Sequence, residues 1–152
     1  MRMRRLIPWL IPGARILLGA VFIFAALPKL ADPPAFAKAI WNYQLVPEAL
    51  LSPLALTLPW LELLCGLALV LGVWTRPAAA WVAILLTGFM LSLGLNLARN
   101  HPVDCGCFGS PSQPRSEAER LSDMKVDIAR DAGLLALALL LLLSSGKGRP
   151  EP

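Results

Sequence analysis

Three long apolar stretches constrain this chain more than any other feature of its sequence. They cover about residues 12–30, 53–74 and 77–98, and each is close to the roughly 20 residues with which a helix crosses about 30 Å of hydrocarbon. Hydrophobic residues make up 57% of the chain and charged residues 16%, whereas a soluble domain carries about a quarter charged residues. The sequence therefore predicts an all-α integral membrane protein.

A fourth span is indicated by its beginning more than by its length. The apolar run AGLLALALLLLLSS is too short to cross a bilayer alone. Upstream of it, Ser116 and Glu119 have the S-x-x-E spacing of a capping box. We therefore expect a helix from there to about Ser145, polar in its first turns and inside the bilayer over residues 124–145.

The segment between the first two spans has a different character. It reads DPPAFAKAIWNYQLVPEALLSP, is bounded by prolines and is mildly amphipathic. These features favour a short interfacial helix, in which Trp41 and Tyr43 would suit the headgroup region. The expected architecture is one membrane domain over residues 1–152, a four-helix transmembrane bundle with this short helix between spans one and two. Glycines on the second and third spans favour close helix packing: Gly66, Gly72, Gly88 and Gly94.

The basic residues predict an orientation in the membrane. An even number of spans places both termini on one side, and the positive-inside rule makes that side cytoplasmic. The residues that support this orientation flank the expected spans: Arg2, Arg4, Arg5, Arg76, Lys147 and Arg149. The basic, apolar N-terminus resembles a signal peptide, but the length of its run favours an uncleaved anchor. The loop of residues 100–115 then lies on the outer face, where protein disulfides form.

Two cysteines in that loop are the first candidate site. Cys105 and Cys107 are separated only by Gly106, in the sequence DCGCFG. A disulfide in so small a ring would be strained, and strain makes the bond easy to reduce, as in a catalytic disulfide. Two alternatives use the same residues: thiolates that bind Cu(I), and a plain structural pair. The single histidine, His101, could tune the thiols.

The second candidate site lies inside the second span. Counted from Pro53 at about 1.5 Å per residue, Glu62 is roughly 13 Å deep, near the bilayer midplane. A carboxylate there should face the bundle interior, be protonated or have a cationic partner. It could serve proton or redox chemistry, or form a salt bridge that fixes helix register. Cys65 shares its helical face at i+3, but could equally be a small buried hydrophobe.

Two basic residues of the first span are candidate partners of Glu62. Arg15 and Lys29 are fourteen residues apart, so they return to nearly the same helical face near opposite ends of the span. Either could instead extend its charged group to the membrane interface.

These residues also carry a family resemblance. The stretch ARILLGAVFIFAALPKLADPPAF, followed by PWLELLCGLALVLGVWTRPAA, resembles the DoxX-like membrane proteins. In that family a first-span arginine, a lysine near the end of that span and a second-span glutamate recur. The sequence DCGCFG narrows the resemblance to the MauE branch, the methylamine utilisation proteins. By position, the resemblance marks five residues: Arg15, Lys29, Glu62, Cys105 and Cys107.

The resemblance implies a redox-associated protein of the bacterial inner membrane, linked to maturation of a disulfide-rich protein. The expected function is thiol–disulfide exchange between Cys105–Cys107 and a periplasmic thioredoxin-like or client protein. Whether this makes the chain an enzyme, a thiol–disulfide oxidoreductase, stays open. A membrane quinone is the candidate cofactor, although no quinone motif is present. The alternatives are a non-enzymatic assembly or metal-handling factor and a small transporter built around Glu62. The lipid bilayer is the expected surrounding, and the placement of basic residues argues against nucleic-acid binding.

Overall fold

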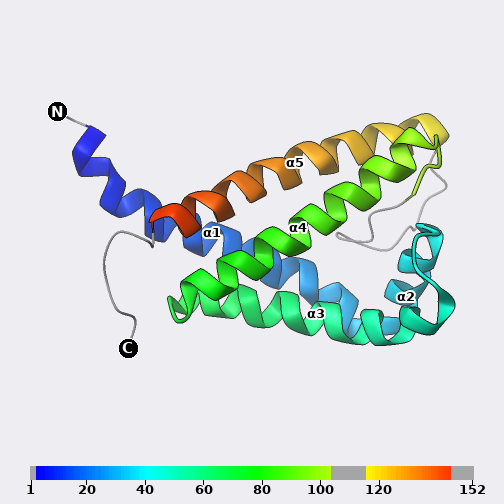
Figure 1. Ribbon diagram of the computed structural model, residues 1–152, viewed down its shortest axis with the longest axis horizontal. Coiled ribbons are helices and arrows are strands. Elements are labelled where there is room, and N and C mark those ends of the chain that lie inside the picture. Colours follow the sequence, from blue (N-terminus) through cyan, green and yellow to red (C-terminus); the bar gives the residue numbers. More distant parts are fainter. Residues whose placement is uncertain (1–2, 104–115, 145–152) are drawn as a thin grey trace.

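The computed structural model describes residues 3–103 and 116–144, with side chains from Leu10 onward. Within these residues the chain forms five α-helices and no β-strand. Four long helices run side by side, and a short one lies across one end of the bundle (Figure 1). The helices are α1 (Met3–Ala31), α2 (Pro33–Asn42), α3 (Glu48–Leu71), α4 (Thr75–Ala98) and α5 (Glu117–Ser144). The predicted all-α bundle is confirmed.

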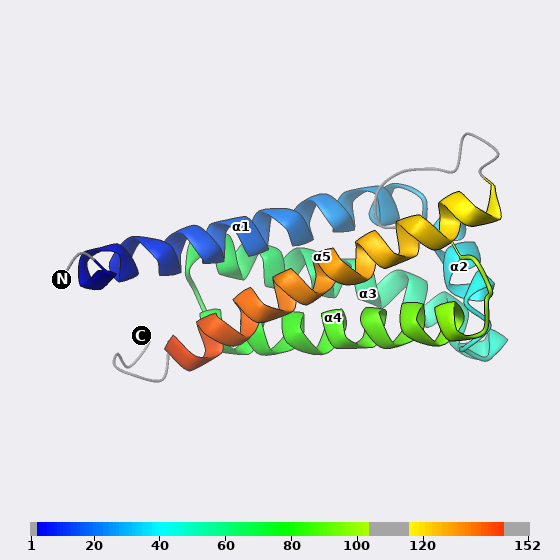
Figure 2. The ribbon, with the colours of Figure 1, turned by 90° about the horizontal axis from the view of Figure 1, so that it is seen from above.

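Three of the long helices have the length and apolarity of membrane spans. They are Leu10–Ala31 within α1, and the whole of α3 and α4. Helix α5 has 28 residues, or about 42 Å at 1.5 Å per residue, and it packs along α4 and α1 (Figure 2). The chain is therefore a multi-pass membrane protein, and the crossing of the bilayer by α5 stays a prediction.

The helices begin earlier than the sequence indicated. The predicted spans start at residues 12, 53 and 77, whereas the helices start at Met3, Glu48 and Thr75. The predicted starts are prolines, and each of these prolines lies inside its helix. Pro53 and Pro59 are both interior residues of α3. A membrane helix tolerates interior proline because neighbouring helices and local adjustments satisfy the freed backbone groups.

The start of α5 confirms the predicted capping box. The backbone N–H of Ser116 donates to Glu119 Oε2 at 2.9 Å, and the backbone N–H of Glu119 lies 3.3 Å from Ser116 Oγ. This reciprocal pair satisfies donors that the first turn leaves free. The helix ends at Ser144, one residue from the predicted end.

The short helix α2 is also confirmed, with one correction. Asp32 caps it by accepting a hydrogen bond from the Ala35 backbone N–H at 3.1 Å, and Trp41 is 46% exposed, as expected of a headgroup residue. Tyr43, expected beside it at the interface, is buried instead. It packs in a small core with Leu93, Val103 and Met124, which come from α4, the turn after it and α5.

Helices α1 and α3 approach so closely that their backbones touch. A Cβ on Gly19 would lie 2.7 Å from the Gly66 carbonyl oxygen, and a Cβ on Gly66 would lie 2.8 Å from that of Gly19. Only glycine fits at this crossing. At Gly88 and Gly94 an added Cβ would meet nothing within 4 Å, so the predicted close packing at these two glycines is wrong.

Candidate functional site: a buried ion pair where five helices meet

The centre of the candidate site is an ion pair between α1 and α3. Lys29 Nζ donates to both carboxylate oxygens of Glu62, at 2.7 and 2.8 Å, and both residues are only 2% exposed. The expected interior position of Glu62 and its cationic partner are therefore confirmed. Extension of Lys29 to the membrane interface is excluded by its burial.

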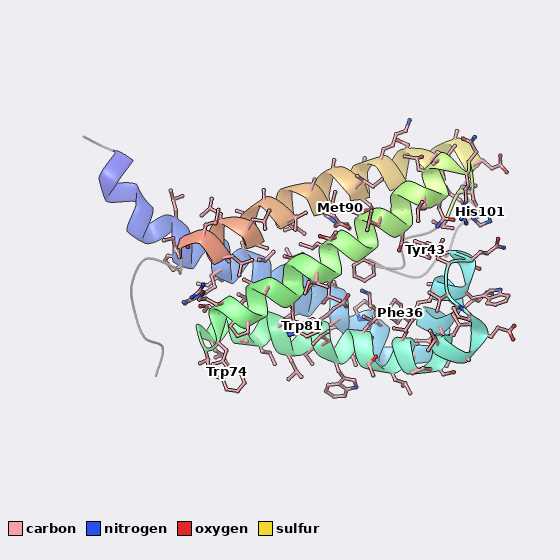
Figure 3. All side chains as sticks on the ribbon, in the orientation of Figure 1. Phe36, Tyr43, Trp74, Trp81, Met90 and His101 are labelled. Atoms are coloured by element: carbon pink, nitrogen blue, oxygen red, sulfur yellow. The ribbon has the colours of Figure 1, made fainter. Side chains whose placement is uncertain are left out.

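Two aromatic rings enclose the ammonium group. Lys29 Nζ lies 5.0 Å from the ring centroid of Phe36 on α2 and 5.0 Å from that of Phe89 on α4. A cation over a ring face at this distance is attracted by the ring quadrupole, and more strongly when water is excluded. Phe36 lies at the α2 end of the bundle (Figure 3). The rings thus replace part of the hydration that the lysine loses on burial.

The fifth helix contributes a carboxylate that the sequence analysis missed. Asp131 on α5 is 4% exposed and interacts electrostatically with Lys29. Its Oδ1 accepts two hydrogen bonds from Arg130, at 3.0 and 3.2 Å, and Arg130 also pairs with Asp127 at 3.0 Å. The sequence spacing could have indicated that Asp131 shares a face with core residues. It lies seven residues from the buried Met124 and from the buried Ala138, on one helical face.

The other candidate partner of Glu62 lies elsewhere. The guanidinium of Arg15 packs against Gly72, where an added Cβ would lie 2.8 Å from Nη1. Gly72 caps the C-terminus of α3 with a φ of 78°, at the end of the bundle opposite α2 (Figure 1). A cation there complements the negative end of the helix dipole. The structure therefore separates Arg15 from the Lys29–Glu62 pair.

The cysteines divide between the core and the part of the chain that the structure does not describe. Cys65 is a free, buried thiol in the apolar core with Leu18, Phe22 and Leu69. Cys105 and Cys107 lie outside the described residues. Among the described residues, no group of three His, Cys, Asp or Glu side chains could hold a metal ion.

The end of α4 and the residues that follow it, up to Val103, pack against the bundle. Helix α4 ends with the backbone N–H of His101 donating to the Asn96 carbonyl at 2.9 Å, and that of Asn100 to the Leu97 carbonyl at 3.1 Å. This is the hydrogen-bond pattern of a Schellman motif. Val103 then packs into the small core beneath Tyr43. Helix α4 therefore ends, and helix α5 begins, at the α2 end of the bundle (Figures 1 and 2).

Comparison with known proteins identifies the family of the chain. A profile of the family described as "Methylamine utilisation protein MauE" matches residues 7–144. The match covers nearly all of the bundle, including Lys29, Glu62 and Asp131. The chain belongs to the MauE family. The predicted MauE branch is thereby confirmed, and the wider relation to DoxX-like proteins stays a prediction.

Several MauE proteins are similar to this chain. "Methylamine utilization protein MauE" of Methylophilus methylotrophus is 36% identical over 100 residues, which cover 65% of this chain and 53% of the relative. The protein of that name from Methylorubrum extorquens is 36% identical over 115 residues, covering 75% and 58%. That of Paracoccus versutus is 35% identical over 135 residues, covering 88% and 67%. The matched part thus spans little more than half of the first two relatives. No solved structure matches the chain.

Proposed function

We propose that this MauE-family protein acts in methylamine utilisation by thiol–disulfide exchange with a protein outside the cytoplasm. The observation that carries the proposal is the position of the sequence DCGCFG, which follows the buried Val103 at the α2 end of the bundle. Two thiols so close in sequence, next to a rigid membrane anchor, suit exchange with a soluble partner. The names of the similar proteins supply the metabolic setting.

The exchange needs only the two cysteines and a partner that carries a disulfide or a dithiol. A thiolate of the pair attacks one sulfur of the partner disulfide, and the other partner sulfur leaves as a thiolate. The second cysteine then attacks the mixed disulfide, so that Cys105–Cys107 becomes oxidised and the partner gains two electrons. The reverse sequence oxidises a partner dithiol. In one direction of exchange the partner is a client protein. In the other direction a thioredoxin-like protein returns the cysteine pair to its starting redox state.

Within this proposal the Lys29–Glu62 pair has a supporting role. It joins α1 to α3, with Lys29 near the α2 end of α1. A buried carboxylate beside an ammonium can accept and return a proton, which suits a relay to a membrane electron carrier such as a quinone. An apolar groove on α3, lined by Leu56, Trp60 and Leu64 among others, has a volume of about 520 Å³. Glu62 does not line this groove, so the quinone part of the proposal rests on the family resemblance.

The proposed orientation places the cysteine pair on the outer face of the bacterial inner membrane. The first turns of α1 and the last turns of α5 lie at one end of the bundle, opposite α2 (Figure 1). The two ends hold equal numbers of basic residues, but those of the α2 end lie in longer segments among acidic residues, whereas Arg76 lies in a short turn and the others of that group lie in or near the termini. This distribution supports a cytoplasmic location for both termini.

Trapping of a mixed disulfide tests the proposed exchange. Cys105→Ser and Cys107→Ser each leave one thiol, and a lone attacking thiolate can bind a partner but cannot release it. We expect one single variant to accumulate a reductant-sensitive higher band on a non-reducing gel, with more of it than the other variant. The partner in the band can be identified by mass spectrometry. Cys65→Ser is the matched control, because that thiol is buried in the core, and it should trap nothing new.

The double variant Cys105→Ser, Cys107→Ser completes the test. It should abolish the band and the ability of the protein to support growth on methylamine. If neither single variant traps a partner and the double variant keeps full activity, thiol exchange is refuted. A non-redox assembly factor would then be the better account of the protein.

A further inference from the structure

A polar cavity lies at the α2 end of the bundle. It has a volume of about 250 Å³, and its lining includes Trp41, Asn42, Gln44, His101 and Arg120. These residues come from three separate parts of the chain: the end of α2, the turn after α4 and the first turns of α5. The cavity therefore lies where the residues on both sides of the cysteine segment meet the interfacial helix.

Two backbone turns shape this cavity at some conformational cost. Gln44 and Asn100 each have a φ of 51°, in the left-handed region that non-glycine residues rarely adopt. Each directly follows a helix end, since Tyr43 caps α2 and Arg99 caps α4. The left-handed residues turn the chain sharply, so that Gln44 and the His101 that follows Asn100 both line the cavity.

Two buried nitrogen atoms of cavity residues have no hydrogen-bond partner among the described residues. They are Nε of Arg120 and Nδ1 of His101. A buried polar atom without a partner costs about 1–3 kcal/mol, and more when the group is charged. Glu119, the acidic neighbour of Arg120, already binds the Ser116 backbone N–H in the helix cap. The guanidinium thus lacks a carboxylate partner in the described part of the chain.

We propose that this cavity binds the phosphate of an anionic lipid headgroup. An arginine presents N–H donors in a planar fork that suits phosphate oxygens, and the amides of Asn42 and Gln44 supply further donors. The neighbouring Trp41 is 46% exposed on a short helix across the bundle end, as is typical of residues at the level of lipid headgroups. A phosphate in the cavity would connect α2 to the residues on both sides of the cysteine segment.

This inference is independent of thiol exchange, because none of the cavity residues is a cysteine. It can be tested on the purified, delipidated full chain by native mass spectrometry, with titration of phosphatidylglycerol or phosphatidylcholine. A parallel titration with inorganic phosphate, followed by thermal shift, examines a free anion as the ligand. We expect phosphatidylglycerol to bind in preference to phosphatidylcholine. Arg120→Gln should weaken that binding about tenfold or more, the loss expected for a hydrogen bond to a charged group.

Two further variants make the test specific. Lys125→Gln removes the same charge from an exposed position of α5 and should leave binding within about twofold. Asn42→Asp places a negative charge at an exposed rim position and should weaken binding as Arg120→Gln does, even if the latter variant folds poorly. The proposal is overturned if Arg120→Gln and Lys125→Gln weaken binding equally, or if no lipid binds and water alone fills the cavity. Binding of inorganic phosphate without phosphatidylglycerol would overturn the lipid assignment and identify a site for a free anion.

Discussion

The Lys29–Glu62 pair offers the sharpest test of how this bundle is held together. The change Lys29→Met removes the ammonium and both of its hydrogen bonds, at 2.7 and 2.8 Å, but keeps a side chain of similar length. It leaves the Glu62 carboxylate at 2% exposure with neither bond. Removal of one partner of a buried ion pair costs about 3–5 kcal/mol. For a chain of this size, each kcal/mol lowers Tm by about 2–4 °C, so the expected loss is about 6–20 °C.

The double variant Lys29→Met, Glu62→Met separates the contribution of the ion pair from the cost of leaving one buried charge unpaired. Replacement of both members by apolar side chains of similar volume is often neutral or stabilising by about 1–4 kcal/mol. Asp131 keeps its hydrogen bonds from Arg130 in both variants, so it does not become a second unpaired charge. We therefore expect the double variant to recover most of the lost stability, measured by thermal unfolding of the full chain in one detergent.

The same two variants distinguish an ion pair that only stabilises the fold from one that relays a proton. If the pair serves only packing, the double variant should also support growth on methylamine. If Glu62 carries a proton, the double variant should be stable but inactive. The reasoning about burial would be refuted if Lys29→Met unfolds at the temperature of the wild type. It would also be refuted if the double variant is as unstable as the single one.

Two other predictions concern packing and orientation. Gly66→Ala should destabilise the protein by about 1–3 kcal/mol, because its Cβ would lie 2.8 Å from a backbone oxygen of α1. The matched control Gly88→Ala, with nothing within 4 Å, should be neutral or gain about 0.5–1 kcal/mol, and equal thermal shifts for the two would contradict the close crossing. For orientation, an alkaline phosphatase fusion after Ser110 should be active and one after Arg76 inactive. The reverse pattern would place the cysteine pair in the cytoplasm.

Features that depend on a single segment of the chain could be predicted from the sequence. The cap of α5 by Ser116 and Glu119 was one, because its partners are three residues apart and the backbone brings them together whatever else the chain does. The membrane spans were another, because length and apolarity are properties of a single segment. The prolines were misleading as boundaries, since Pro53 disfavours a helix only locally and the bundle compensates for it.

Partners across the bundle were decided by the tertiary structure. The sequence indicated that Glu62 should face the interior, be protonated or have a cationic partner, and it offered Arg15 and Lys29 on nearly the same face of one helix. The choice between them depends on how α1 lies against α3, which the Gly19–Gly66 contact sets, and it brings together residues 33 positions apart.

The burial of Asp131 and Tyr43 followed the same pattern. Each became interior because other parts of the bundle cover it. The spacing of Asp131 from Met124 and Ala138 indicates a shared helical face, but only the tertiary structure decides what covers that face. The sequence was sufficient to predict a helical membrane protein and the cap at the start of α5, because those signals are local. The tertiary structure alone decided which charges meet, because that depends on distances between helices that only packing sets.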